Sequence, residues 1–241
     1  MTSAIMTVNL AGIVPLSTVD MRDKSVIVIF FSGCPFRCVY CQNYEYLEAQ
    51  NPVELNLIKS HIDRAAEFVD GVVFTGGEPT MQKEPLKELL KYSYEKGLIT
   101  EIQTNGCDYP TIRYLLSYLD IISMDMKAPL NAKIYGEICG IDEKFAERTI
   151  ENIRRILMIE EKKIEVKTTV YKEFVDFLEE IKGDLPKDID WIIQRGNDER
   201  VPPSFNLTPL SDDEVKDIAK ILSKNRKNIW IRTRAGDEKI S

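Results

Sequence analysis

Short runs of β-branched and other apolar residues alternate along the chain with longer segments in which apolar residues recur every three or four positions. The short runs have the length and composition of buried β-strands, and the longer segments have the spacing of amphipathic helices. The expected strands are Val26–Ser32, Val72–Thr75, Ile99–Thr104, Ile121–Met126, Ile164–Tyr171, Trp191–Gln194 and Ile229–Thr233. This alternation predicts right-handed βαβ connections and a mainly parallel sheet.

Two helical stripes and three further segments complete the expected organisation. A helix should begin after Ser211, because Ser211–Glu214 (SDDE) has the pattern of a capping box. The run Leu10–Leu16 should pair with the first strand as a hairpin. The segment Gly196–Pro209 contains two adjacent prolines and predicts a long irregular loop. The stripes are Leu86, Leu89, Leu90 and Tyr94 in one helix, and Phe145, Ile150, Ile153 and Leu157 in another.

The number of expected strands bears on the fold class. Seven parallel units are too few to close the eight-stranded barrel of the TIM type. We therefore expect an α/β fold in the form of a partial, open TIM-like barrel of about six or seven parallel β/α units. A doubly wound sheet is the alternative, because strand order is not visible in a sequence. The length of 241 residues fits one domain, with an N-terminal extension or hairpin over 1–25, core units over 26–195 and a C-terminal loop, helix and strand over 196–241.

The composition is that of a globular protein of the cytoplasm. Apolar residues make up 44% of the chain and charged residues 29%, which excludes the disordered and fibrous classes. The longest unbroken apolar run, Val26–Phe31, is too short to cross a bilayer, and the N-terminus lacks a secretory signal, so we expect no membrane partner. The net charge of −7 argues against nucleic acid as the main partner, because phosphate binding requires a basic face.

Chemically distinctive residues stand where the expected strands end. Active sites of parallel α/β proteins lie at the carboxyl ends of their strands, so we expect these residues to converge on one site. In strand order they are GCPFRCVYCQN (Gly33–Asn43), GGEP (Gly76–Pro79), TNG (Thr104–Gly106), Asp125 with Lys127, and Gln194.

Three of the five cysteines, Cys34, Cys38 and Cys41, lie within eight residues. In a reducing compartment such a group more often binds metal or takes part in catalysis than forms disulfides. Structural zinc would need a fourth ligand, and the only histidine, His61, lies downstream in a helical segment. A redox pair of Cys38 and Cys41 is a second alternative. The third is an iron–sulfur cluster held by three thiolates, which leaves one iron open to an outside ligand.

Two further cysteines and two basic residues receive no role in this site. Cys107 and Cys139 lack partners at ligand spacing and are expected to be buried as small apolar residues. Lys167 and Arg232 alternate with apolar neighbours along their strands and are expected to face solvent. We therefore expect one group of metal-binding cysteines rather than two.

The cysteine motif and the later GGEP motif, in this order, carry a family resemblance. The cysteines have C-x3-C-x2-C spacing with an aromatic residue, Tyr40, before the last of them, which resembles the signature of radical S-adenosylmethionine (SAM) enzymes. GGEP resembles the second motif of that superfamily. Over most of the chain, the stretches LSTVD, FFSGCPFRCVYCQN, FTGGEPT, QTNG, MDMK and WIRTRAGDEK resemble the glycyl-radical-enzyme activating proteins, above all the activases of anaerobic ribonucleoside-triphosphate reductases.

The resemblance implies cofactors, a reaction and partners. Cys34, Cys38 and Cys41 would ligate three irons of a [4Fe–4S] cluster, and SAM would bind the fourth iron. Reductive cleavage of SAM would give a 5′-deoxyadenosyl radical, which in activases removes a hydrogen from a glycine of a partner enzyme. The implied partners are a glycyl radical enzyme, of the anaerobic ribonucleotide reductase or pyruvate formate-lyase type, and a low-potential electron donor such as ferredoxin or flavodoxin.

The resemblance also implies SAM contacts in the second motif. The ammonium group of SAM would meet the backbone of Gly76 and Gly77 and the side chain of Glu78, and Pro79 completes the motif. The two glycines lack side chains, so backbone can approach a ligand closely. Taken alone, the same glycines would also fit a tight turn.

Further implied contacts follow the later strands. Asp125 would bind ribose hydroxyls and Lys127 a carboxylate, although the two would equally form a solvated ion pair if judged alone. The other implied contacts are Tyr40 near the adenine, Thr104 and Asn105 along the methionine side, and Gln194 at the far rim.

Two alternatives to the activase stay open. The same cofactors would also serve an enzyme acting on a small molecule or a tRNA-modification precursor, as in the similarly short 7-carboxy-7-deazaguanine synthases. The other alternative is a non-catalytic zinc or redox module that uses the three clustered thiolates.

Overall fold

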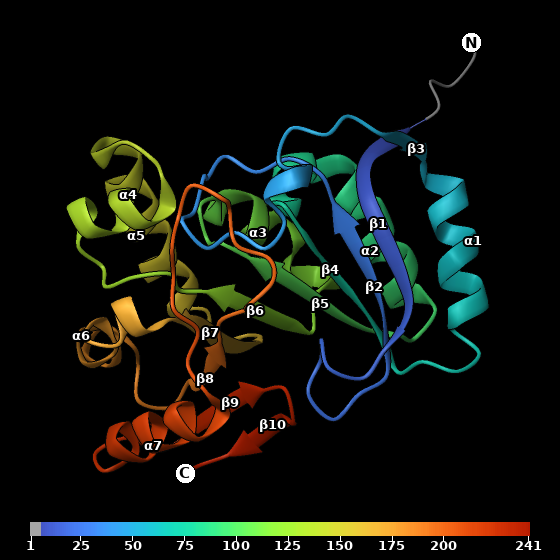
Figure 1. Ribbon diagram of the computed structural model, residues 1–241. Helices are drawn as coiled ribbons and strands as arrows, with labels where there is room; N and C mark the ends of the chain where they lie inside the picture. Colours follow the sequence, from blue (N-terminus) through green and yellow to red (C-terminus); the bar gives the residue numbers. More distant parts are fainter. Residues whose placement is uncertain (1–5) are drawn as a thin grey trace. The chain divides into compact units, whose positions relative to one another are not determined.

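The computed structural model describes residues 6–241, which divide into two compact units. The first unit consists of residues 6–35, Glu45–Thr104 and Pro110–Ile122. The second unit consists of Phe36–Tyr44, Asn105–Tyr109 and Ser123–Ser241. Strands and helices alternate along the chain in both units (Figure 1).

The first unit is a mixed sheet with helices packed on it. Its strands are β1 (Thr7–Ser17), β2 (Val26–Phe31), β3 (Pro52–Glu54), β4 (Gly71–Gly76) and β5 (Ile99–Thr104). Its helices are α1 (Leu55–Ala65), α2 (Lys83–Glu95) and α3 (Tyr109–Leu115), with short 3₁₀ helices η1 (Tyr44–Tyr46), η2 (Pro79–Gln82) and η3 (Leu116–Tyr118). The strand order is β5-β4-β2-β1-β3. Strands β2, β4 and β5 are parallel, whereas β1 runs antiparallel to both β2 and β3.

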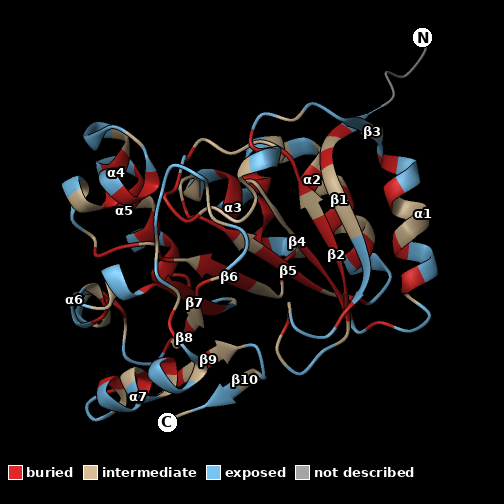
Figure 2. Ribbon diagram, in the orientation of Figure 1, coloured by how far each residue is buried: buried red, intermediate tan, exposed pale blue. Residues whose placement is uncertain are grey.

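The central strands of the first unit are buried on both faces. In β2 five of the six residues are buried, and Val28 packs with Val73 of β4 in an apolar cluster. Helix α1 contacts α2 and β1, and α2 contacts β4 and β5. Figure 2 shows buried residues along these strands and exposed residues on the outer helix faces. Burial on both faces is typical of parallel strands covered by helices.

The second unit repeats the strand–helix pattern. Its strands are β7 (Lys163–Val170), β8 (Asp190–Arg195), β9 (Ile229–Thr233) and β10 (Gly236–Lys239), and β6 (Ile121–Asp125) begins in the first unit and ends in the second. Its helices are α4 (Ala132–Cys139), α5 (Glu143–Leu157), α6 (Phe177–Asp184) and α7 (Asp212–Ser223), with the 3₁₀ helix η4 (Lys172–Phe174). The order is β10-β9-β8-β7-β6. Strands β7, β8 and β9 are parallel, and β10 is antiparallel to β9.

Local sequence signals explain where several helices begin and end. The Asp142 side chain accepts a hydrogen bond from Phe145 N and caps the start of α5. The capping box at Ser211 and Glu214 is formed as predicted at the start of α7. Helix α4 ends at Gly140, which adopts the left-handed conformation that favours glycine.

Most of the predicted elements are confirmed. All seven expected strands are present, and β5 and β9 have the predicted bounds. The predicted hairpin forms between β1 and β2, and no helix or strand interrupts residues 196–209. The stripe of Leu86, Leu89, Leu90 and Tyr94 lies in α2 as predicted; its three leucines are buried, and Tyr94 is 45% exposed in the last turn. Within residues 6–241 no helix has the length and apolar character needed to cross a membrane.

Candidate active site

The cysteine motif begins directly after β2. Cys34 belongs to the first unit, and Cys38 and Cys41 belong to the second. Cys38 is buried and the other two are half-buried, and all are present as thiols. Among the described residues, the structure does not assemble three His, Cys, Asp or Glu side chains into a metal site. Ligation by the three cysteines therefore stays a prediction.

The loops that carry the two motifs meet in the first unit. Gly77 N donates to Phe31 O at 2.8 Å, and Glu78 N donates to Gly33 O at 2.7 Å. A Cβ on Gly77 would lie 1.9 Å from Gly33 O. Gly76 has a φ of 121°, a value that favours glycine. The glycines are thus required because backbone packs on backbone, and close approach of the same backbone to a ligand stays a prediction.

The Glu78 side chain is fully buried behind these loops. Its Oε1 accepts hydrogen bonds from Thr80 N at 3.1 Å, from Thr80 Oγ1 at 2.5 Å and from Thr104 Oγ1 at 2.9 Å. Thr104 ends β5, and Pro79 opens the 3₁₀ helix η2. Three donors on one carboxylate oxygen offset the cost of burying it and fix its orientation. The structure therefore brings the predicted residues Glu78 and Thr104 together.

Asn105 follows Thr104 but belongs to the second unit. Its side chain is buried, and its Oδ1 accepts a hydrogen bond from Cys107 N at 3.0 Å. The Cys107 carbonyl in turn accepts from Asn152 Nδ2 at 2.6 Å. These bonds hold the turn that follows β5. Asn105 therefore lies at the carboxyl end of a strand, as expected for a residue of the site.

Asp125, Lys127 and Tyr40 form one group in the second unit. Lys127 Nζ and the Asp125 carboxylate form an ion pair. Tyr40 donates its hydroxyl hydrogen bond to Lys127 O at 3.1 Å, and Lys127 Nζ lies 5.8 Å from the centre of the Tyr40 ring. Burial alone would lower the pKa of Lys127, but the charges of Asp125 and Cys38 raise it well above its usual value. The ion pair is half-buried rather than solvated, and Lys127 keeps its positive charge.

Aromatic side chains fix the Tyr40 ring. The ring centres of Tyr171 and Phe174 lie 5.8 Å and 5.9 Å from that of Tyr40. Burial raises the pKa of the Tyr40 hydroxyl well above its usual value, so the group stays neutral. Rigid aromatic packing gives Tyr40 one orientation.

Gln194, the residue expected at the far rim, lies near the end of β8 and is half-buried.

The three motif cysteines have different surroundings. A side-chain hydrogen bond with Cys139 lowers the pKa of the Cys38 thiol; burial opposes this effect and Lys127 adds to it. Burial raises the pKa of Cys41. The sequence contained no sign of the contact between Cys38 and Cys139, because only the fold brings these distant positions together. The prediction that Cys139 is buried among apolar residues is confirmed, and the structure adds its closeness to Cys38.

Three other expectations need correction. Lys167 does not face solvent, because its residue is only 7% exposed on β7. Arg232 is half-buried and binds both carboxylate oxygens of Asp237 at 2.7 Å. Cys107 is half-buried rather than buried. Strand β7 is covered on both faces, so alternation with apolar neighbours does not identify a solvent-facing side.

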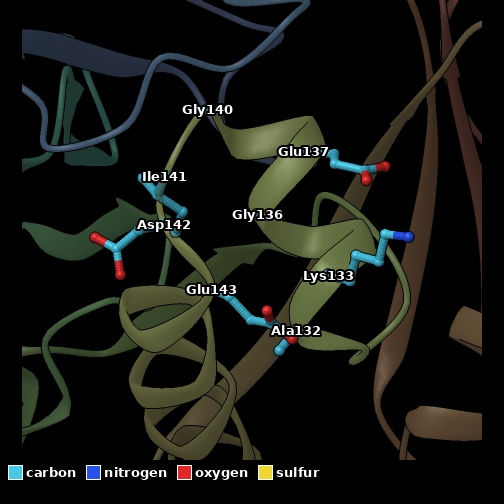
Figure 3. A pocket seen from close by; sticks show the side chains of 8 residues that line it. All are labelled: Ala132, Lys133, Gly136, Glu137, Gly140, Ile141, Asp142 and Glu143. Carbon is cyan, nitrogen blue, oxygen red and sulfur yellow. The ribbon is translucent and has the colours of Figure 1, made fainter.

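A pocket of about 390 Å³ lies between α4 and the start of α5 (Figure 3). Its lining includes Lys133, Glu137, Asp142 and Glu143, whose side chains are labelled in the figure. None of the residues predicted for the active site lines it. The pocket is therefore separate from the groups described above.

Comparison with known proteins identifies the superfamily and the fold of this chain. The family model "Radical SAM superfamily" matches residues 28–170. The solved structure of a radical SAM methyltransferase from Sphaerobacter thermophilus has a TM-score of 0.69 and 14% identity, and covers 90% of this chain and 68% of that chain. This likeness confirms the expected fold, an α/β partial TIM-like barrel.

Curated relatives narrow the assignment. A putative glycyl-radical enzyme activating enzyme of Methanocaldococcus jannaschii is 30% identical in an alignment 239 residues long, which covers 95% of this chain and 98% of that protein. A pyruvate formate-lyase-activating enzyme of Clostridium pasteurianum is 34% identical in an alignment 109 residues long, which covers 42% of this chain and 44% of that protein. The chain belongs to the radical SAM superfamily and, within it, to the glycyl-radical enzyme activating family.

Membership implies a [4Fe–4S] cluster and SAM as cofactors, and the residues present fit both. The three thiols of the motif are the donor type that iron–sulfur clusters require. The buried carboxylate of Glu78 is held by three donors, and neighbouring charges raise the pKa of the Lys127 ammonium well above its usual value. These charges are opposite in sign to the ammonium and carboxylate groups of SAM.

Proposed function

We propose that this radical SAM enzyme generates a glycyl radical on a partner enzyme of the anaerobic ribonucleotide reductase or pyruvate formate-lyase type. The observation that carries the proposal is the match of nearly the whole chain to a putative glycyl-radical enzyme activating enzyme, together with the hydrogen bond from Glu78 N to Gly33 O at 2.7 Å that joins the two loops bearing the superfamily's motifs. The Methanocaldococcus jannaschii relative, matched over nearly its whole length, supports the choice of an activating enzyme over one that acts on a small molecule.

The cysteines provide the ligands in this proposal. Cys34, Cys38 and Cys41 would hold a [4Fe–4S] cluster and would leave one iron open to SAM. When bound, the cluster would supply the electron for reductive cleavage of SAM. The contribution of the chain itself is to bind, orient and exclude water.

The second motif and the end of β5 bind the amino end of SAM. The negative charge of the buried Glu78 carboxylate favours the ammonium group at this end of SAM, while Thr80 and Thr104 hold the orientation of the carboxylate. The backbone of Gly76 and Gly77 and the ring of Pro79 shape this side of the site. Because the carboxylate is already fixed in the folded chain, little side-chain entropy is lost on binding.

The remaining contacts position the other parts of SAM. Lys127 binds a carboxylate, Asp125 accepts from ribose hydroxyls, and the Tyr40 ring packs beside the adenine. Thr104 and Asn105 line the methionine side, and Gln194 lies at the far rim. The proposed electron donor is a low-potential protein such as ferredoxin or flavodoxin, since reductive cleavage of SAM consumes an external electron.

Anaerobic reconstitution tests the proposal. The protein is loaded with iron and sulfide, mixed with SAM, a reductant and a glycyl radical enzyme encoded beside it or co-purifying with it, and followed by electron paramagnetic resonance. We expect a glycyl-radical doublet that Cys41→Ser abolishes. Cys107→Ser removes a cysteine outside the motif and should leave the doublet unchanged.

Two results would contradict the proposal in different ways. An intact cluster without a doublet, together with 5′-deoxyadenosine release that depends on a small molecule, would establish the alternative substrate class. Stoichiometric zinc without iron or sulfide would establish the zinc module and reject radical chemistry altogether.

A further inference from the structure

The end of helix α4 is bonded to the cysteine motif within the second unit. Arg37 N donates to Cys139 O at 2.8 Å, and Val39 N donates to Ile138 O at 3.0 Å. The two backbone bonds lie on either side of Cys38 along the chain. They hold Cys38 in a defined position against the last turn of α4.

Gly140 permits this close approach. It ends α4 with φ 62° and ψ 44°, and a Cβ there would lie 2.4 Å from Arg37 O. Figure 3 shows Gly140 at the end of α4, where the chain turns toward Asp142 and α5. The Phe36 ring packs edge-on against Phe145 of α5, with ring centres 5.8 Å apart. The motif is therefore anchored to both helices.

The side chain of Cys139 lies inside this contact. It is fully buried, and the two backbone bonds place it beside Cys38, near enough for the two thiols to influence each other's pKa. A ligating sulfur carries no proton, so in the loaded protein Cys139 is the donor of the pair. This arrangement is that of a second residue which orients and tunes a metal ligand.

We propose that Cys139 is a positioning residue whose thiol donates an S–H···S hydrogen bond to the ligand sulfur of Cys38 and thereby raises the reduction potential of the cluster. The inference rests on the proposed ligation by the three motif cysteines. A donor to a ligand sulfur stabilises the additional negative charge of the reduced cluster. Without the donor, the cluster should be harder to reduce.

Two substitutions test this role in the full-length protein. Cys139→Ala removes the donor, and Cys139→Ser replaces it with a hydroxyl donor of similar size. After anaerobic reconstitution, iron and sulfide content and the midpoint potential are measured, the latter by redox titration followed by electron paramagnetic resonance of the reduced cluster. We expect all variants to retain the cluster, with a more negative midpoint potential in Cys139→Ala. Cys139→Ser and the control Cys107→Ser should remain near the wild type.

Three outcomes would overturn the inference. An unchanged potential in Cys139→Ala would show that the hydrogen bond does not tune the cluster. Equal shifts in the alanine and serine variants would assign the effect to packing, and loss of the cluster in both would make Cys139 a ligand rather than a donor. A wild-type protein that takes up no iron would instead contradict the proposed ligation, so the two failures are distinguishable.

Discussion

At the scale of single residues, Glu78 is buried and hydrogen-bonded, and it also belongs to the proposed SAM site. One carboxylate oxygen accepts from Thr80 N, Thr80 Oγ1 and Thr104 Oγ1, and none of the residue is exposed. A buried acceptor of this kind is costly to remove, because its donors are then left without a partner.

Substitution of Glu78 should separate stability from binding. Glu78→Ala removes the acceptor of three donors. Each donor that stays buried without another partner should lower the free energy of unfolding by about 1–3 kcal/mol. Glu78→Gln keeps one acceptor oxygen and should unfold at a urea concentration closer to the wild type. Its neutral side chain should nevertheless weaken SAM binding by about tenfold, or about 1.4 kcal/mol, measured by calorimetry on reconstituted protein. Unchanged affinity in Glu78→Gln would remove Glu78 from the binding site.

Gly77 tests the contact between the motif loops. Gly77→Ala places a Cβ 1.9 Å from Gly33 O, so backbone must shift, and overpacking of this kind costs about 1–3 kcal/mol. The control is Gly183→Ala on the exposed side of α6, where a Cβ meets nothing within 4 Å. That change should be neutral or stabilise the helix by about 0.5–1 kcal/mol. Equal unfolding midpoints for the two variants in urea would contradict this account of the glycine.

At the scale of elements, the start of α7 carries a pH-dependent interaction. Glu214 Oε2 accepts from Ser211 N at 2.7 Å and from Ser211 Oγ at 2.8 Å. These bonds, assisted by Lys172, lower the pKa of Glu214 from 4.5 to about 2. The folded-state pKa lies below the unfolded one, so ionised Glu214 stabilises the fold above pH 4.5 and that contribution is lost as the pH falls to about 2.

Glu214→Gln removes this titration but keeps an acceptor for Ser211. The difference in unfolding free energy between wild type and Glu214→Gln should be positive and constant near neutral pH. It should shrink between pH 4.5 and about 2, as measured by urea denaturation at a series of pH values. Ser211→Ala removes the hydroxyl donor and should reduce the size of this pH-dependent difference. A difference that does not change with pH would contradict the role of the capping box.

The elements also show which signals a sequence carries. The sequence predicts strand β5 with its observed bounds, because a run rich in β-branched residues is followed by the turn residues Asn105 and Gly106. Strand β10 (GDEK) has no β-branched or aromatic residue, and it forms because β9 offers an edge for pairing. Lys167 was misplaced because both faces of β7 are buried, so period-two alternation has no solvent side to report.

The candidate site also has features that the sequence reveals and features that only the fold reveals. Motif spacing identified Cys34, Cys38, Cys41 and Glu78 because their chemistry is local in the sequence. The hydrogen bond from Thr104 to Glu78 and the closeness of Cys38 to Cys139 depend on tertiary packing. Such contacts leave no periodic or spacing signal, so a single sequence cannot reveal them.

At the scale of the whole molecule, binding of SAM should stabilise the reconstituted protein against unfolding. A ligand that binds only the folded state adds RT ln(1 + [L]/Kd), which is about 2.7 kcal/mol at a hundredfold excess over Kd. We therefore expect SAM to raise the urea midpoint of the cluster-loaded protein and to have a much smaller effect on protein without iron. Methionine, which lacks the adenosyl group, serves as the ligand control. Equal stabilisation of loaded and iron-free protein by SAM would show that the open iron does not contribute to binding, and would contradict the proposed cofactor arrangement at the level of the whole chain.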